Sequence, residues 1–88
     1  MKVEFRESFL KDLQNVNNTK LLAKVKTSIE NAELARFPLE IHNFKKLKGF
    51  STYFRIKIGE YRIGLAMEND TITFVRLLPR KEIYRFFP

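Results

Sequence analysis

The segment YFRIKIGEYRI, residues 53–63, constrains the fold more than any other part of the chain. Apolar and polar residues alternate on both sides of Gly59-Glu60, which is the pattern of two β-strands joined by a two-residue loop with glycine first. The segment therefore predicts an antiparallel hairpin. Because alternate residues of a strand point to opposite faces, one face of this hairpin should carry three cations: Arg55, Lys57 and Arg62.

A two-residue loop also fixes which residues lie opposite one another. Lys57 should pair with Arg62, and Arg55 with Gly64, which has no side chain and leaves room. Like charges placed directly opposite one another destabilise a sheet by roughly 0.2–1 kcal/mol. Such a cluster, beside an open floor at glycine, is suited to binding a phosphate. The alternative is that these are solvated charges on an exposed sheet, paired with acids elsewhere.

The other elements follow from hydrophobic periodicity and from capping residues. Asn18 or Thr19 can cap the second helix, and Pro38 marks the latest position at which that helix can end. The expected elements are a strand at 2–5, a helix at 7–16, a helix from 19 to before 38, strands at 52–58, 61–67 and 71–77, and a short helical segment at 80–87. Residues 39–49 are expected to form a basic connector.

This order predicts one α+β domain over residues 1–88, with two N-terminal helices packed on one face of an antiparallel sheet of about four strands and a short C-terminal helix. The helix-facing side of the hairpin should be apolar. Arg76 does not fit this pattern, because strict alternation through the Asn69-Asp70 turn would point it toward the core. A β-bulge or a position near the rim would explain it, and the sequence leaves both open.

The charge is concentrated in the second half of the chain. Residues 45–88 hold ten Lys and Arg against four acids, whereas residues 1–44 hold seven against six. A basic half of a folded domain indicates a polyanion or an acidic partner, and the alternative is charge that only aids solubility. The chain has no cysteine and no long apolar run. We therefore expect no disulfide, no membrane span, no secretory signal and a cytoplasmic protein.

Further candidate residues lie on either side of the hairpin. Arg80 and Tyr84 are four residues apart, so a helix would place them on the same side. A Tyr there could stack on a base or pack at the edge of the core. His42 is the only histidine, and no Gly-rich phosphate loop or carboxylate pair indicates a metal or cofactor site. The connector adds three candidate RNA-binding cations: Lys45, Lys46 and Lys48.

The run KLKGFSTYFRIKIGEYRIGLAMENDTITFVRLLPRKEIYRFF resembles the RelE/ParE superfamily of toxins from type II toxin–antitoxin systems. The resemblance rests on the KLKG step, the paired strands and the closing RKEIY. It implies a RelE-like fold, akin to small microbial ribonucleases, and an mRNA interferase that cuts mRNA in the ribosomal A site without a metal ion or cofactor. It also implies three partners: a cognate antitoxin, the ribosome and mRNA.

The resemblance also implies the site. Lys57 would take the proton of the ribose 2′-OH or hold the attacking oxygen, Arg80 would face the leaving oxygen, and Tyr84 would stack on the base or orient the sugar. Two further cations, Arg55 and Arg62, would neutralise the phosphate. The chain departs from the family pattern at Arg55, where some relatives carry Lys, and at Pro79, where many carry His.

Two other functions remain open at this point. A ParE-like inhibitor of DNA gyrase shares the scaffold but is expected to lack the clustered strand cations and the terminal Tyr. A non-catalytic RNA-binding module would keep the basic surface without the chemistry.

Overall fold

Five strands form one sheet in the order β1-β5-β4-β3-β2. The computed structural model describes all 88 residues, from Met1 to Pro88. The strands are β1 (Lys2–Phe5), β2 (Phe44–Lys46), β3 (Tyr53–Ile58), β4 (Tyr61–Glu68) and β5 (Thr71–Pro79). The helices are α1 (Glu7–Gln14), α2 (Thr19–Leu34) and α3 (Arg80–Phe86), with a 3-10 turn η1 at Pro38–Glu40. None of the helices has the length and apolar character needed to cross a bilayer.

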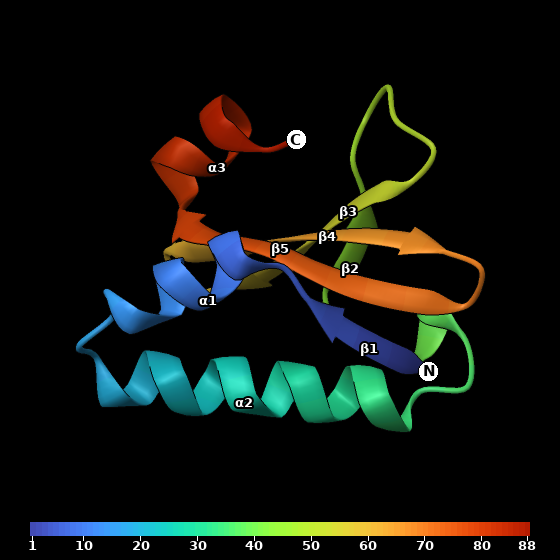
Figure 1. Cartoon of the computed structure of the whole chain (residues 1–88), viewed down its shortest axis with the longest axis horizontal. Coiled ribbons are helices and arrows are strands. Elements are labelled where there is room, and N and C mark those ends of the chain that lie inside the picture. Colours follow the sequence, from blue (N-terminus) through green and yellow to red (C-terminus); the bar gives the residue numbers. More distant parts are fainter.

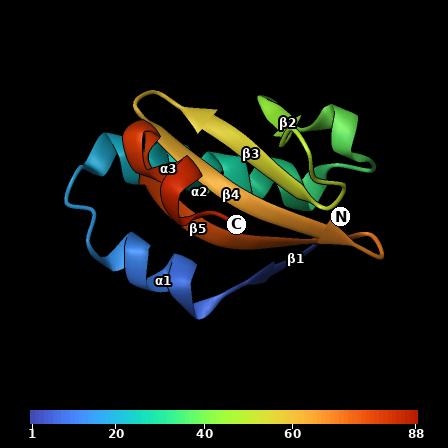
Figure 2. The same cartoon turned by 90° about the horizontal axis from the view of Figure 1, so that it is seen from above.

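The sheet lies between two unequal layers. Helices α1 and α2 lie on one side of it, and the short α3 lies on the other side together with the β2–β3 loop (Figure 1). Seen from above, α3 lies over β4 and β5 (Figure 2). The α+β architecture and the two N-terminal helices agree with the sequence-based prediction.

The predicted hairpin register is confirmed at both of the pairs named above. In the structure Lys57 faces Arg62 and Arg55 faces Gly64. Gly59 begins the loop with a φ of 55°. A positive φ is costly for a residue with a Cβ, so glycine suits the first position of this loop.

Two features of the sheet differ from the prediction. The number of strands is five rather than about four, because Phe44–Lys46 in the expected connector forms the edge strand β2. Its pairing is short, since only three residues of β2 face β3. The sheet is also not wholly antiparallel, because β1 runs parallel to β5, with Lys2 facing Thr71.

The helix boundaries have local causes. The Asn18 side chain caps α2, and its Oδ1 accepts hydrogen bonds from the backbone N–H groups of Lys20 (3.0 Å) and Leu21 (3.1 Å). This satisfies two of the donors that a helix leaves unpaired at its start. Helix α1 ends at Gln14, two residues before the predicted end at residue 16. Helix α2 ends at Leu34, ahead of the limit set by Pro38.

The strand β5 contains the β-bulge that the sequence left open. Gly64 faces Arg76 while Leu65 faces Phe74, so that Val75 has no partner on β4. The carbonyl oxygen of Val75 accepts a hydrogen bond of 2.6 Å from Ser8 Oγ of α1. The bulge changes the alternation along β5 and accounts for the anomalous position of Arg76.

A carboxylate of α1 binds the residues that follow the bulge. Asp12 accepts hydrogen bonds from Arg76 Nε (2.7 Å), Arg76 Nη2 (3.1 Å) and the backbone N–H of Leu77 (2.9 Å). This pair raises the pKa of the Arg76 guanidinium, chiefly through the hydrogen bonds to Asp12. Since β1 ends at Phe5, the Asp12 carboxylate takes the place of a strand beside this part of β5.

Two separate hydrophobic clusters fill the molecule. The larger one has 13 buried residues, lies between the sheet and α1 and α2, and includes Phe9, Ile63 and Phe74. The smaller one lies under α3 and has three buried residues: Leu47, Ile83 and Phe87. The sheet is therefore well covered on one face and lightly covered on the other.

Candidate nucleic-acid interface

The cations of the hairpin lie on the sheet face that carries α3. Ile56 and Ile58 belong to the core under α1 and α2, so the residues that alternate with them, Arg55 and Lys57, point to the opposite side. Lys57 is exposed and Arg55 is half-buried. We call the surface formed by Arg55, Lys57 and Arg62 the cationic face.

Arg62 belongs to this face but is buried rather than openly exposed. Its side chain is folded back on the hairpin loop, and Nη1 donates hydrogen bonds to the carbonyl oxygens of Gly59 (2.7 Å) and Tyr61 (2.9 Å). Only 6% of the residue is accessible to solvent. Arg62 therefore lies on the predicted face, but it is covered, and two carbonyl oxygens of the hairpin loop bind part of its guanidinium. The guanidinium still places a positive charge at this position, because an Arg side chain is not deprotonated in proteins.

The predicted open floor at Gly64 is also wrong. The ring of Phe87 lies directly on this glycine, and an added Cβ would come within 2.7 Å of the ring. Phe87 is buried, while its neighbour Phe86 is exposed. Gly64 therefore makes room for an aromatic ring of the same chain rather than for a ligand. Arg55, opposite Gly64, lies beside the end of the chain instead of beside an empty surface.

Helix α3 brings two further predicted residues to this face. Its first backbone N–H, from Arg80, donates a hydrogen bond of 2.7 Å to the carbonyl oxygen of Glu60 in the hairpin loop. This contact fixes the start of α3 at the end of the hairpin where Lys57 and Arg62 lie. Tyr84 follows four residues later, and 62% of it is exposed. Most of the Tyr84 side chain is therefore open to solvent, and the covered part lies near the small cluster under α3.

The three lysines of the segment that was expected to be a connector lie in different surroundings. Two are in β2 and one is in the loop that follows it. Lys45 faces Arg55 across the strands, which extends the cationic face by one residue. Lys46 faces Phe54, so it points to the side of α1 and α2 and away from the other cations. Lys48 lies in the β2–β3 loop, near the C-terminal end of α3.

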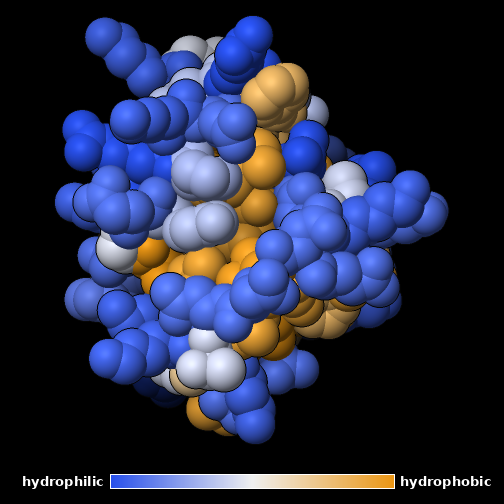
Figure 3. Space-filling model, turned by 90° about the vertical axis from the view of Figure 1, so that its left-hand side faces the viewer, coloured by the Kyte–Doolittle hydropathy of each residue, from blue (hydrophilic) through white to orange (hydrophobic).

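No carboxylate of the chain pairs with these cations. The four salt bridges join Lys2 to Glu4, Lys11 to Glu7, Arg36 to Glu40 and Arg76 to Asp12. None of them includes a cation of the cationic face or of α3. Hydrophilic side chains cover most of the end of the molecule at which α3 begins, and apolar ones appear there mainly in a central hollow (Figure 3). The alternative that acids of the same chain neutralise the cationic face is excluded.

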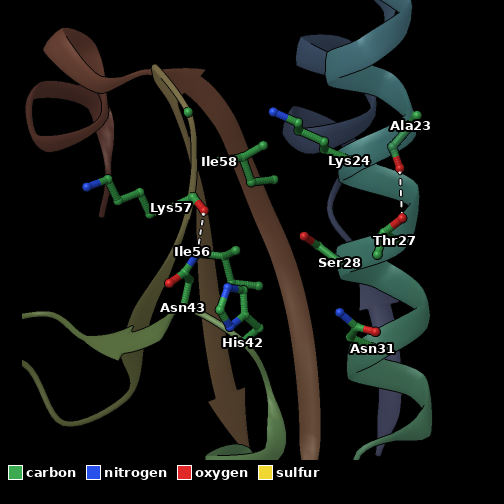
Figure 4. A pocket seen from close by; sticks show the side chains of 11 residues that line it. Ala23, Lys24, Thr27, Ser28, Asn31, His42, Asn43, Ile56, Lys57 and Ile58 are labelled. Carbon is green, nitrogen blue, oxygen red and sulfur yellow. Dashed lines mark hydrogen bonds between the residues drawn. The ribbon is translucent and has the colours of Figure 1, made fainter.

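A polar pocket on the other side of β3 is separate from this face. It lies between α2 and the edge of β3, and His42, Asn43 and Ser28 are among its lining residues. The Lys57 backbone contributes to it, with its carbonyl oxygen accepting from Asn43 Nδ2 (3.3 Å), but the Lys57 side chain points away from it (Figure 4). His42 thus lies on the opposite side from the predicted site. No group of three or more His, Cys, Asp or Glu lies close enough together to hold a metal ion.

One aromatic residue on this side of the sheet, Phe50, was not singled out from the sequence. Phe50 lies in the β2–β3 loop with 44% of its surface exposed. Its ring contacts Tyr53 edge-to-face at 5.5 Å, and Tyr53 contacts Phe87 in the same way at 5.5 Å. The signal for Phe50 in the sequence was its position beside Gly49, in a stretch that also carries Lys48.

Comparison with known proteins places the chain in a family. The model of the ParE toxin of the type II toxin–antitoxin system parDE matches residues 3–84. The chain belongs to the RelE/ParE superfamily. Toxin RelE3 of Methanocaldococcus jannaschii is 40% identical over 89 residues, which cover 100% of both chains. The members of this family are toxins of toxin–antitoxin pairs, as the resemblance implied.

Solved structures agree with this assignment. The RelB-RelE antitoxin-toxin complex from Methanococcus jannaschii contains a chain that is 38% identical, with a TM-score of 0.82 over 97% of this chain and 99% of that one. The archaeal RelE-RelB complex from Pyrococcus horikoshii contains a chain with a TM-score of 0.72 at 22% identity, over 90% of this chain and 93% of that one. At that identity the second likeness supports the RelE-like fold alone.

Proposed function

We propose that this toxin is a ribosome-dependent endoribonuclease that cleaves mRNA in the A site without a metal ion, and thereby inhibits translation in the cytoplasm. The observation that carries the proposal is a set of unpaired cations at one end of the hairpin. Lys57 lies beside Arg62, and Arg80 is fixed to the same hairpin loop. No carboxylate of the chain forms a salt bridge with any of the three. An RNA phosphate supplies the missing negative charge.

The reaction is a transesterification within the RNA. The ribose 2′-oxygen forms a bond to the adjacent phosphorus, the bond from phosphorus to the 5′-oxygen breaks, and a cyclic phosphate end and a 5′-hydroxyl result. In its neutral form Lys57 accepts the 2′-OH proton; in its charged form it holds the attacking oxygen while water takes that proton. Arg80 stabilises the leaving 5′-oxygen, which takes a proton from water to become the 5′-hydroxyl. Two cations, Arg55 and Arg62, stabilise the charge that grows on the phosphate oxygens. Tyr84 stacks on a neighbouring base.

The burial of Arg62 changes its role within this scheme. Because Nη1 already binds two loop carbonyls, Arg62 both supports the loop that positions Lys57 and contributes positive charge. Substituting Arg62 would therefore affect stability together with activity. Lys57 and Arg80 are better positions for a test, since both side chains are exposed.

The test compares purified Lys57→Ala and Arg80→Ala with the wild type on ribosomes programmed with a defined mRNA. Removing one stabilising charge from a reacting phosphate lowers the rate by about 100- to 1,000-fold. Lys20→Ala, which removes an exposed cation of α2, is the matched control and should cleave as the wild type does. Cleavage products are mapped by primer extension, and urea unfolding verifies that each variant is folded. Undiminished cleavage by both site variants would refute the proposal.

A second candidate function is inhibition of DNA gyrase. The observation in its favour is that the matching family model describes ParE toxins. A supercoiling assay distinguishes the two functions, because a gyrase inhibitor leaves plasmid relaxed while ribosome-bound mRNA stays intact.

A cognate antitoxin is the proposed partner. The solved relative from Methanococcus jannaschii is a complex of RelE with its antitoxin RelB. An acidic or amphipathic segment of such a partner would complement the cationic face. The test is to mix the toxin with a small acidic protein that a neighbouring reading frame encodes. The expected result is a stable complex that no longer cleaves mRNA.

A further inference from the structure

An aromatic pocket lies between the β2–β3 loop and the C-terminal end of α3. Its volume is about 370 Å³, and its lining residues are Leu47, Lys48, Phe50, Tyr84, Phe87 and Pro88. Ligand pockets in proteins are commonly about 300–1,000 Å³ and mostly apolar, with a few polar groups at the edge. None of the six lining side chains is acidic. The β2–β3 loop and α3 both rise from the same side of the sheet (Figure 1).

The walls of this pocket are fixed by the fold. Leu47 and Phe87 are buried in the small cluster under α3. The Leu47 N–H donates to the Tyr53 carbonyl oxygen at 2.9 Å, and the Phe50 N–H donates to the Leu47 carbonyl oxygen at 3.2 Å. Gly49 makes the turn between them with a φ of 86°. The pocket is therefore formed before any ligand arrives, which lowers the entropic cost of binding.

Two exposed aromatic rings line the pocket from different elements. Phe50 comes from the loop and Tyr84 from α3, and they are 44% and 62% exposed. Tyr53 contacts the Phe50 ring edge-to-face at 5.5 Å and so holds Phe50 without covering it. Exposed rings held in place beside a cavity form a platform on which another flat ring can stack.

Two cations lie in the pocket or close to it. Lys48 is part of the lining, and Arg80 lies one helical turn before Tyr84, about 6 Å along the axis of α3. Neither takes part in any of the salt bridges of the chain. The combination of a flat apolar platform with adjacent cations matches a nucleobase with its own phosphate. An apolar peptide side chain would use the platform but not the cations.

We propose that this pocket binds one unpaired RNA base, stacked on Phe50 and Tyr84, with the adjoining phosphate held by Lys48. The proposal deepens the ribonuclease function and rests on it: Lys57 and Arg80 act on the scissile phosphate at the hairpin loop, while the aromatic pocket holds a base one helical turn away. Phe50 is then the residue that fixes the position of the RNA along α3.

The test is the binding of a short single-stranded RNA that carries one 2-aminopurine, whose fluorescence is quenched by stacking. Losing a base–aromatic stack weakens binding by about 5- to 150-fold, and we expect this loss together with loss of quenching in Phe50→Ala. Phe37→Ala is the matched control, since Phe37 is 48% exposed and lies outside the pocket. It should bind within about twofold of the wild type.

Two further variants separate stacking from folding. Phe50→Leu keeps an apolar contact with Tyr53 but has no aromatic ring, so it should unfold like the wild type and still lose quenching. Phe50→Trp should retain both binding and quenching. In Lys48→Ala, the slope of the logarithm of affinity against the logarithm of salt concentration should fall by about 0.7, the value for one phosphate contact on a single strand.

Different results would refute the base-pocket proposal and the ribonuclease proposal. If Phe50→Ala binds the RNA as tightly as Phe37→Ala does, the base pocket is refuted, whether or not the wild type cleaves mRNA. It is equally refuted if the wild type binds no RNA, or if Phe50→Ala weakens only the binding of an antitoxin. If the wild type binds RNA through Phe50 but cuts nothing on the ribosome, the pocket stands and the ribonuclease proposal falls.

Discussion

The two faces of the sheet are built for different tasks. The face under α1 and α2 buries a core of 13 residues, and the face under α3 buries three. The first face provides most of the hydrophobic stabilisation, which scales with the apolar area removed from water. The second face leaves Lys57, Tyr84 and Phe50 exposed. A small protein can thus confine its stability to one face and keep the other for binding.

The same contrast holds for arginine residues of the two regions. Arg76 has a carboxylate partner, Asp12, at 2.7 Å, and this pair serves the fold. Arg55 and Arg80 have no such partner among the salt bridges of the chain. Charges that are paired within the molecule stabilise it, whereas unpaired charges on a rigid surface are available to a polyanion.

The largest expected effect is on the well-covered face. Phe74 is fully buried and packs its ring against Phe5 and Phe9 at 5.5 and 5.4 Å. Phe74→Ala should lower the free energy of unfolding by about 3–5 kcal/mol, which is a large part of the roughly 4–13 kcal/mol expected for a domain of this length. Urea unfolding measures it. Phe86→Ala, at an exposed Phe of α3, is the control, and an equal loss there would contradict the comparison.

A core substitution under α3 should have a smaller and more local effect. Ile83 is fully buried but belongs to the cluster of three. Ile83→Ala should lower the free energy of opening of α3 by about 2–4 kcal/mol, because few other contacts hold this helix. Hydrogen exchange should show faster exchange in α3, with β3 and β4 unchanged. Uniformly faster exchange through the sheet would show that the two faces are not independent.

A third prediction concerns the carboxylate that replaces a strand beside β5. Asp12→Asn keeps an acceptor for the Leu77 N–H but loses the charged bonds to Arg76. We expect a loss of about 1–3 kcal/mol in the free energy of unfolding, the range for hydrogen bonds to charged groups. Glu7→Gln, which breaks the exposed pair with Lys11, should cost about 0.5 kcal/mol or less. Equal effects of the two variants would argue against the role given to Asp12.

The smallest effect is expected at an exposed pair far from the cationic face. The backbone N–H of Arg36, at 2.6 Å, and then its guanidinium, at 3.1 Å, lower the pKa of the Glu40 carboxyl. A carboxyl with a lowered pKa in the folded state contributes stability at neutral pH and loses it as the pH falls through that pKa. An NMR titration of Glu40 measures this. In Arg36→Ala the pKa should return only part of the way, because the backbone donor remains.

Local sequence signals predicted much of the fold correctly. The two-residue loop at Gly59-Glu60 determined every pair of the hairpin, because loop length sets register. Asn18 marked the start of α2. The α3 residues Arg80 and Tyr84 were also placed on one element from their spacing alone. These predictions succeeded because the interactions behind them join residues that are close in sequence.

The missed features depend on contacts between distant parts of the chain. Strand β2 has only three residues and no alternation of its own, so only its pairing with β3 defines it. The partner of Arg76 lies 64 residues away in α1. The contact between the Phe87 ring and Gly64 likewise could not be predicted from either residue alone. Because of this contact, the surface at Gly64 is covered rather than open. Arg62 was assigned to the correct face, but its two loop carbonyls became visible only in three dimensions.

The parallel pairing of β1 with β5 has a consequence for the growing polypeptide. Lys2 pairs with Thr71, so β1 cannot form its strand pairing until about four-fifths of the chain has been synthesised. Contacts of such long sequence separation form late and slow the search for the native state. A chain that stops before residue 71 therefore lacks β5, which joins β1 to the rest of the sheet, and α3, which carries Arg80 and Tyr84.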